Sequence, residues 1–409
     1  MPTVVFVAPY FVETTMRFVA AVARLPGVRF GLIAHEPEEK LPPELRPLVA
    51  GYLRVGDSLE PRTLAGAVET LAARLGPIER LIGTLEELQV PLAEVRAHFG
   101  IPGLTVEPAL NFRDKSRMKD VLRAAGVPCA RHRLCGEPGE CRAFASEVGF
   151  PLVVKPPAGA GARNTFRVDG AAQLEEWLAV TPPRPERAAL LEEFITGQEH
   201  SFDSITIHGR TVWSSISRYD PTPLEVLRNP WIQWCVVLPR DVSGAEYHAI
   251  HEMGPRALAA LGMGSGMTHM EWFRRRDGSI AISEVAARPP GAQFTTLISY
   301  AHDLDLYRAW ARVVVHDEFD PAPRRYAVGA AYLRGQGPPD GKARVRAVHG
   351  LEDAREVAPL VVESRLPRPG QTHAVGYEGD GYVIVRHPDT AVVERALSRI
   401  VSVIRVELG

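Results

Sequence analysis

Cysteine is scarce in this sequence of 409 residues, and its four copies form no Cys-x-x-Cys pair. Cys129, Cys135 and Cys141 follow one another at intervals of six residues, and Cys235 stands apart. This spacing fits no common zinc motif. We therefore expect reduced, structural thiols, which are typical of a cytoplasmic protein.

Long apolar runs and basic excess are also missing. No stretch of 18 apolar residues occurs, and the start, MPTVVFVAPYFVETTMRF, lacks the basic region and the cleavage site of a signal peptide. With 47 Lys and Arg against 49 Asp and Glu, the formal charge is −2. A general nucleic-acid surface needs a clear basic excess. The sequence therefore predicts neither a membrane span nor a nucleic-acid partner.

What is present is the composition of a soluble globular protein, with 45% hydrophobic and 23% charged residues. The length suits two or three domains. Buried-type strands alternate with amphipathic helices in the first quarter of the chain, which predicts a doubly wound parallel sheet over residues 1–105. The expected strands are 3–10, 28–35, 78–84 and a short one at 100–105, and the expected helices are 14–25, 61–75 and 86–99.

Two common phosphate-binding motifs are absent. The turn after the first strand, APYFVE, contains no glycine, so the dinucleotide fingerprint fails. The Gly-rich stretch after Lys155 contains no Gly-Lys-Ser/Thr, which excludes the P-loop. Residues 106–310 mix helices with hairpins. Residues 311–409 read as α+β, with strands at 325–335 and 379–387 and a helix at 391–406, so the fold class is α/β and α+β.

The stretch THMEWFRRRDGSIAISEVAARPPG, residues 268–291, predicts a hairpin around Asp277-Gly278. A two-residue loop would place Phe273 opposite Ile282 and Glu271 opposite Glu284, roughly 5 Å apart at Cβ. Two carboxylates this close need a shared proton or a cation, and Mg²⁺ suits oxygen ligands that phosphates complete. The alternative is a longer turn that slips the register and leaves one Glu in solvent.

Three further stretches contain candidate binding residues, each with an ordinary alternative. Lys155 closes a buried strand before Gly159 and Gly161, where an ammonium and free N–H groups could meet phosphates, although a plain hairpin has the same pattern. Residues 189–207 contain a connector suited to an adenine edge, with Glu199 as a ribose acceptor, or simply a β-turn with exposed acids. Lys115 lies in the first turn of an amphipathic helix over 114–125, or is a solvated charge.

The order of these stretches along the chain resembles the ATP-grasp superfamily over residues 105–310. The flanks resemble the Rossmann-like pre-ATP-grasp domain and the small C-terminal domain of its biotin-carboxylase-like branch. The resemblance implies three domains, over residues 1–105, 106–310 and 311–409. It also implies a homodimer.

The resemblance assigns roles at the nucleotide and metal site. ATP and Mg²⁺ are the implied cofactors, with Mn²⁺ as an alternative. Lys115 and Lys155 would hold the α- and β-phosphates, Lys155 also acting in catalysis, and Glu271 and Glu284 would bridge the metal to the β- and γ-phosphates. Arg288 would neutralise the acyl-phosphate and tetrahedral intermediates. The remaining nucleotide ligands are the covering loop with Gly159 and Gly161, the purine segment Glu192, Glu193, Phe194 and Ile195, the ribose acid Glu199, and Phe273 against the adenine.

One departure concerns a metal ligand. The superfamily usually follows its second Glu with an Asn two residues later, and this chain has Ala286 there. Alanine cannot ligate, so a second metal would be held less completely.

The activity implied is that of a carboxylate–amine ligase, which forms an acyl phosphate and releases ADP and phosphate. The stretch RPPGAQ after Ala287 resembles ligases that join amino acids, so small-molecule carboxylates and amines are the expected partners. Two alternatives stay open. A biotin-carboxylase-like enzyme would need a Val-Glu-His base that is absent after Arg288, and a nucleotide-binding module without turnover is suggested by Ala286 alone.

Specificity is expected from an insertion over residues 217–239. Tyr219, Trp231 and Trp234 could line a substrate pocket, with Arg218 or Arg228 meeting a carboxylate, or the tryptophans could be ordinary core. His269 and His302 are expected to be structural. In the N-terminal domain, Glu86 and Glu87 are the candidates for a substrate wall.

Overall fold

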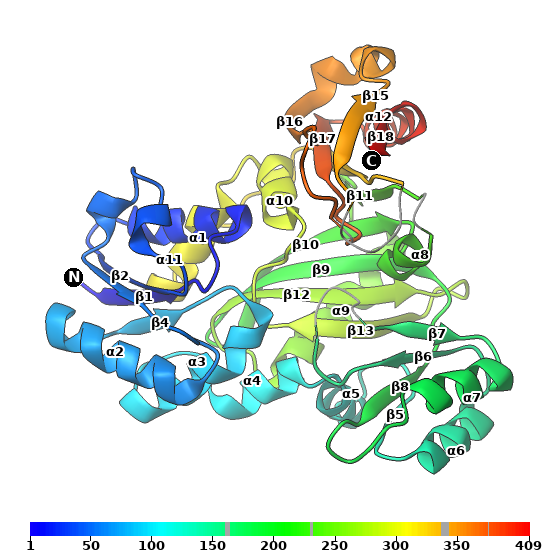
Figure 1. Ribbon diagram of the computed structural model, residues 1–409, viewed down its shortest axis with the longest axis horizontal. Helices are drawn as coiled ribbons and strands as arrows, with labels where there is room; N and C mark the ends of the chain where they lie inside the picture. Colours follow the sequence, from blue (N-terminus) through cyan, green and yellow to red (C-terminus); the bar gives the residue numbers. More distant parts are fainter. Residues whose placement is uncertain (160–163, 230–231, 337–342, 375) are drawn as a thin grey trace.

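The computed structural model describes residues 1–159, 164–229, 232–336, 343–374 and 376–409. Its N-terminal part contains a four-stranded sheet in the order β3-β2-β1-β4, and every neighbouring pair is parallel (Figure 1). The doubly wound arrangement predicted for this region is confirmed. The strands are β1 (Thr3–Val7), β2 (Arg29–Ala34), β3 (Gly51–Arg54) and β4 (Arg80–Ile82).

The two faces of this sheet belong to different cores. Val4 and Phe6 of β1 pack in one core with residues of α1 (Glu13–Ala23) and α11 (Leu306–His316). Their neighbours Val5 and Val7 point to the other face, against α2 (Pro61–Leu75) and α3 (Gln89–Phe99). Successive side chains of a strand point to opposite faces, so a continuous apolar run is what a doubly covered strand requires.

Two expectations for this region are wrong. The edge strand β3 lies between the strand expected at 28–35 and the helix expected at 61–75, where no strand was expected, and residues 100–105 form no strand. Helix α3 ends at Gly100, which adopts a φ of +66°. The residues that follow lead directly into α4 (Val106–Arg113). Glycine adopts such a left-handed φ without steric cost, which explains why the helix stops there.

An antiparallel sheet of eight strands forms the middle of the molecule, in the order β13-β12-β9-β10-β11-β14-β17-β16. The predicted boundary at residue 311 falls inside α11, and β14 pairs directly with β11. The last segment therefore continues the central sheet. The strands are β9 (Gln198–Ile207), β10 (Arg210–Asp220), β11 (Trp234–Leu238), β12 (Gly266–Arg274), β13 (Ile280–Ala286), β14 (Ala327–Leu333), β16 (Val361–Arg365) and β17 (Gly381–His387).

A smaller sheet, in the order β5-β8-β6-β7, lies beyond the β13 edge of the central sheet (Figure 1). Its strands are β5 (His132–Cys135), β6 (Leu152–Lys155), β7 (Phe166–Val168) and β8 (Ala189–Glu193). Helices α6 (Pro138–Val148) and α7 (Ala171–Val180) cover it, and α5 (Lys115–Ala124) packs against both β5 and β13. Helix α5 therefore connects the smaller sheet with the β13 edge of the central sheet.

The remaining elements connect or cover these sheets. The helix expected at 391–406 ends at Val403, and the chain continues as a strand that pairs with β15. No helix in the described part of the chain combines the length and the apolarity needed to cross a membrane. These elements are η1 (Glu38–Lys40), η2 (Arg46–Leu48), η3 (Glu86–Leu88), α8 (Pro223–Arg228), α9 (Ala245–Leu261), α10 (Phe294–His302), β15 (Val345–His349), η4 (Glu352–Leu360), α12 (Thr390–Val403) and β18 (Arg405–Leu408).

Candidate active site

The hairpin of β12 and β13 places Glu271 opposite Glu284, as predicted, but its loop length and its strand register differ from the prediction. The loop has three residues, because Arg275 N–H donates to the Ser279 carbonyl at 2.8 Å and Gly278 adopts a φ of +82°. The longer loop shifts the register by one, so Phe273 pairs with Ala281 and its predicted pairing with Ile282 is wrong. A β-bulge at Ser283 then restores the pairing of the two glutamates.

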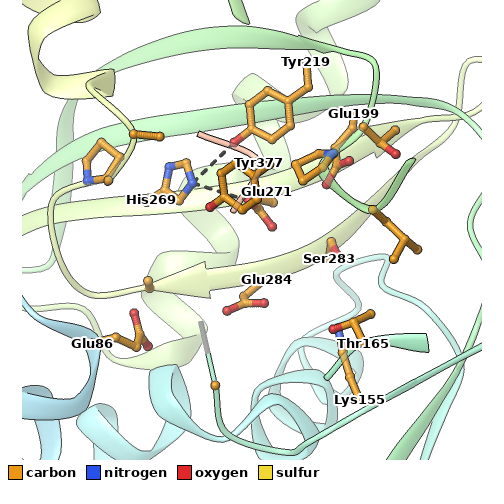
Figure 2. Close-up of a pocket in the computed structure, with 18 of the residues that line it drawn as sticks. Glu86, Lys155, Thr165, Glu199, Tyr219, His269, Glu271, Ser283, Glu284 and Tyr377 are labelled. Atoms are coloured by element: carbon orange, nitrogen blue, oxygen red, sulfur yellow. Dashed lines mark hydrogen bonds and ion pairs between the residues drawn. The ribbon is translucent and has the colours of Figure 1, made fainter. Parts of the chain in front are cut away.

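Both glutamates face a large cavity of about 1290 Å³ between the central and the smaller sheet. Figure 2 shows them on neighbouring strands, with Lys155 approaching from the smaller sheet and Glu86 from the N-terminal domain. Of the residues predicted to bind the nucleotide or the metal or to act in catalysis, all within the described ranges line this cavity, whereas Gly161 lies outside those ranges. They are Lys115, Lys155, Gly159, Glu192, Glu193, Phe194, Ile195, Glu199, Glu271, Phe273, Glu284 and Arg288.

Three lysines face this cavity or lie directly beneath it. Lys115 Nζ lies 3.0 Å from Glu284 Oε1 and donates to the Gly159 carbonyl at 2.8 Å. Lys155 Nζ lies 3.0 Å from Glu192 Oε1, and Lys119 Nζ lies 3.1 Å from the same oxygen. The sequence reasoning missed Lys119. Its spacing of four residues from Lys115 was the available signal, because residues i and i+4 share a helix face.

Burial and charge shift the acids of this cluster in opposite directions. Burial raises the pKa of Glu284, but the nearby Lys115 and Lys155 outweigh it and lower the pKa to about 2. The pKa of Glu192 is also lowered, because Lys119 and Lys155 outweigh its burial. Burial, followed by the charge of Glu271, raises the pKa of Glu199 well above the usual range. At neutral pH the two lysine-paired acids are therefore carboxylates.

His269 belongs to the site, contrary to the expectation of a purely structural role. Its Nδ1 lies 2.6 Å from Asp203 Oδ1, its Nε2 lies 3.7 Å from Glu271 Oε1, and Tyr219 Oη lies 3.4 Å from Nε2 (Figure 2). Burial lowers the pKa of His269, but the two acids outweigh it and raise the pKa to about 9. His302 is structural as expected, since its Nδ1 lies 2.8 Å from the Ala322 carbonyl, outside the cavity.

The flanking segments both reach the cavity. Glu86 Oε2 accepts from Arg288 Nε at 2.7 Å, and Glu87 also lines the cavity, as expected for an N-terminal wall. Tyr377 and Glu378 enter from the C-terminal segment, and no sequence signal pointed to them. The site therefore combines side chains from all three parts of the chain.

The residues expected to bind a purine, 192–195, form the end of β8 and the start of its connection to β9, and they line the cavity. Glu193 pairs with Arg131 at 2.8 Å and with Arg275 at 3.3 Å. The guanidinium of Arg167 lies 4.3 Å from the centre of the Phe194 ring. These contacts hold the end of β8 and the connector that follows it in place.

Some residues of the insertion over 217–239 line the cavity. Tyr219, Trp234 and Arg228 line the cavity, whereas Trp231 lies outside the described ranges. Trp234 is only 1% exposed and packs on Tyr332, so it serves the core as well. Arg218 pairs with Glu394 at 2.5 Å instead of lining the cavity, so its proposed contact with a substrate is not supported.

The turn after Arg288 has a strained backbone. Ala292 and Gln293 adopt φ values of +46° and +63°, directly before α10. Such left-handed conformations of non-glycine residues cost on the order of 1 kcal/mol each and cluster at binding sites. Pro289 to Ala292 line the cavity beside Arg288, and they belong to the stretch RPPGAQ that resembles ligases that join amino acids.

The donor set near Glu271 and Glu284 suits a cation that phosphates help to hold. Among the described residues, no group of three or more His, Cys, Asp or Glu is arranged to hold a metal alone. Ala286 lines the same cavity and offers no ligand atom. Mg²⁺ commonly uses one or two protein carboxylates and takes its other ligands from phosphates and water. The residues present fit that ion.

Comparison with known proteins finds one family model that matches part of the chain. The ATP-grasp domain family matches residues 120–301. An L-arginine-specific L-amino acid ligase of Bacillus subtilis is 24% identical over 272 residues, which span 65% of each chain. The uncharacterized protein y4rH of Sinorhizobium fredii is 25% identical over 87% of this chain and 70% of its own.

Solved structures share the whole fold. The L-amino acid ligase from Bacillus licheniformis superposes with a TM-score of 0.79 at 18% identity, covering 99% of this chain and 98% of its own. An N5-carboxyaminoimidazole synthase from Aspergillus clavatus, solved with ADP, gives 0.72 at 19% identity over 98% of both chains. At these identities the likeness concerns the fold.

Proposed function

We propose that this protein, a ligase with an ATP-grasp domain over residues 120–301, joins the carboxylate of one small molecule to the amine of another at the expense of ATP. The observation that supports this most is the opposition of Glu271 and Glu284 within a cavity that also contains Lys115 and Lys155. Two carboxylates and two ammonium groups at one cavity suit a metal-bound polyphosphate better than either charge would alone.

The nucleotide is proposed to lie between the two sheets. Lys115 and Lys155 would hold phosphates, and the purine segment with Phe273 would hold the adenine. In this assignment Glu192 keeps Lys119 and Lys155 in place, in addition to its part in the purine segment. When bound to Glu271 and Glu284, Mg²⁺ would neutralise charge on the phosphates.

The proposed reaction has two steps. A carboxylate oxygen of the first substrate attacks the γ-phosphorus of ATP, the bond to the ADP oxygen breaks, and an acyl phosphate forms. The amine of the second substrate then attacks the carbonyl carbon, phosphate leaves, and the nitrogen loses a proton. Arg288, fixed by Glu86 at 2.7 Å, would face the negative charge that develops in both steps.

Amino acids are the proposed substrate class. The strained turn over residues 289–293 and Arg288 could receive an α-carboxylate, while Glu86, Glu87 and Glu378 give the cavity wall acids that suit an α-ammonium. The names of the Bacillus ligases agree with this class. The volume of about 1290 Å³ is ample for a nucleotide and two small substrates.

The test is release of ADP and phosphate from Mg²⁺-ATP across a matrix of amino acids and short peptides, with product identified by mass. The Glu284→Gln variant keeps the shape of the side chain and removes its charge, and it is expected to lose at least a hundredfold in kcat. Glu176→Gln, at an exposed position of α7, is the matched control and should keep wild-type activity.

Three outcomes would contradict the proposal. Turnover that needs bicarbonate as its only carbon substrate would favour the biotin-carboxylase-like alternative. Binding of Mg²⁺-ATP without phosphate release under every pair would favour a module without turnover. A Glu284→Gln variant as active as the control would remove the proposed metal site.

A further inference from the structure

The β-bulge in β13 lies directly before Glu284, one of the two proposed metal ligands. On β12, Trp272 pairs with Ile282. The adjacent Glu271 pairs with Glu284, so Ser283 has no residue opposite it. A regular ladder would instead place Ser283 opposite Glu271 and turn Glu284 to the other face of the sheet. With the bulge, Ser283 and Glu284 both line the large cavity, as Figure 2 shows, so the bulge sets the position of the proposed ligand.

The outer edge of β13, the last strand of the central sheet, lies against α5 and the segment that follows this helix. Ile282 N–H donates to the Pro128 carbonyl at 2.8 Å. Val285 N–H lies 3.2 Å from the methionine sulfur of α5. Between these two contacts, the carbonyl of Ser283 accepts a hydrogen bond from Lys119 Nζ at 2.5 Å. The backbone of the bulge is therefore held from α5, because an extra residue in one strand finds no partner in the ladder.

Lys119 is a fixed donor for this carbonyl. Its side chain is fully buried, and its Nζ also lies 3.1 Å from Glu192 Oε1, in the purine segment. A hydrogen bond from a charged donor is roughly twice as strong as one between neutral groups. The same ammonium thus contacts the segment expected to bind the base and the strand that carries Glu284.

We infer that Lys119 is a positioning residue of the metal site: its hydrogen bond to the Ser283 carbonyl fixes the bulge and thereby holds Glu284 opposite Glu271. The inference rests on the proposed function, because it concerns the site assigned there to Mg²⁺. Lys119 lies beneath the cavity and does not line it, so it acts through the backbone of β13 and not by touching metal or substrate.

The first experiment measures metal binding without turnover. Mn²⁺ is the probe, because electron paramagnetic resonance separates its free and bound forms in the presence of ADP. Lys119→Met keeps the length and the apolar body of the side chain and removes the ammonium. At saturating ADP this variant is expected to bind Mn²⁺ at least tenfold more weakly than the wild type, as is typical when the support of a metal ligand is removed. Its affinity for ADP without metal should change less than threefold.

Val68→Ala is the control for a general loss of stability. Val68 is buried on α2, in the core of the N-terminal sheet, and it should affect melting without affecting the hairpin. A purely structural role for Lys119 predicts that both variants melt at a lower temperature and bind Mn²⁺ as the wild type does. That result would overturn the inference.

The second experiment removes the bulge itself. Deletion of Ser283 would leave a regular ladder in which Ile282 keeps the core face and Glu284 keeps the cavity face, still opposite Glu271. The carbonyl that Lys119 holds is then absent, so Lys119→Met should weaken Mn²⁺ binding less than threefold in this background. An equal loss in both backgrounds would overturn the inference, since Lys119 would act through something other than the bulge. The first comparison decides by itself if the shortened chain does not fold.

The wild type separates this inference from the proposed function. If ADP creates no Mn²⁺ site in the wild type, the proposed metal site is wrong and the inference fails with it. If the wild type binds Mn²⁺ with ADP and Lys119→Met binds it equally well, only the inference is wrong.

Discussion

At the scale of single residues, the sequence predicts side chains that belong to a motif and misses those that only support one. Lys115, Lys155 and Arg288 were found because their order along the chain is informative. Lys119 has no motif of its own, yet its Nζ contacts both Glu192 and the Ser283 carbonyl, the latter at 2.5 Å. Which residues a buried charge will meet depends on how two sheets approach each other, and local patterns do not contain that information.

The buried group of Lys119, Lys155 and Glu192 carries one excess positive charge. Removing the acid and removing one lysine should therefore lower the free energy of unfolding by different amounts. Glu192→Gln leaves two ammonium groups facing each other in a dry site and should lower the free energy of unfolding by about 3–5 kcal/mol. Lys119→Met leaves a balanced pair and mainly loses the hydrogen bond to Ser283, so about 1–2 kcal/mol is expected. Urea unfolding of both variants measures the difference. Equal losses would contradict the charge argument.

His302 makes a pH-dependent contribution to stability. Its burial and the neighbouring Arg324 lower its pKa to about 4 from 6.5, and the neutral ring fits its contacts, since Nδ1 faces a carbonyl and Nε2 faces Arg324. Between these values the unfolded chain binds more protons than the folded one. The contribution of the neutral His302 to the free energy of unfolding is therefore fully present above pH 6.5 and is lost as the pH falls towards 4.

This difference in pKa predicts that His302 lowers the free energy of unfolding by about 2 kcal/mol as the pH falls from 7 to 5. In His302→Phe the corresponding loss of unfolding free energy should be smaller by that amount, although His200, with a pKa also lowered to about 4, keeps part of the slope. Urea unfolding at the two pH values tests this. His248→Gln, at an exposed position, should retain the wild-type slope.

At the scale of elements, the hairpin shows what sequence spacing can and cannot determine. The alternation of side chains and Asp277-Gly278 indicated two strands and a turn. The loop length was wrong by one residue, and the bulge at Ser283 compensated for that error. Bulges have no reliable sequence signal, so the opposition of Glu271 and Glu284 was predicted correctly although one assumption behind it was wrong.

Because of this compensation, a deletion in the loop and an insertion in β13 should affect ligase activity differently. Deleting Arg276 shortens the loop to Asp-Gly, which fits a type I′ turn and preserves every strand pair, so ligase activity should be retained. Inserting an alanine between Ser283 and Glu284 moves Glu284 to the opposite face of β13. Activity should then fall to that of Glu284→Gln. Circular dichroism and thermal melting check that both variants fold, and equal activities in folded variants would contradict the register argument.

At the scale of the whole molecule, the predicted three domains are less separate than their sequence boundaries imply. Phe18 of α1 packs against Trp310 of α11, with ring centres 4.9 Å apart, and Phe6 of β1 lies 6.1 Å from the same ring. One core continues from these residues to Tyr332 on β14. Boundaries were placed where motifs ended, whereas long-range packing determines where the folding units end. Tyr377 and Glu378 were missed for the same reason.

The shared core predicts that residues 1–105 do not fold alone. Without α11, Phe6 and Leu32 of the sheet and Phe18 of α1 would lose part of the core that they share with it, and an isolated fragment would lose the burial of several large apolar side chains, at about 1.5–3 kcal/mol each. The fragment should show no cooperative thermal transition by circular dichroism. In the full chain, Trp310→Ala should lower the free energy of unfolding by about 3–5 kcal/mol while leaving a single transition. A fragment that melts sharply, or a full chain whose N-terminal part unfolds in a transition of its own, would show that the N-terminal sheet is an independent unit. The large cavity, which Glu86 and Glu87 of the N-terminal part line, would then lie at a hinge between two folding units.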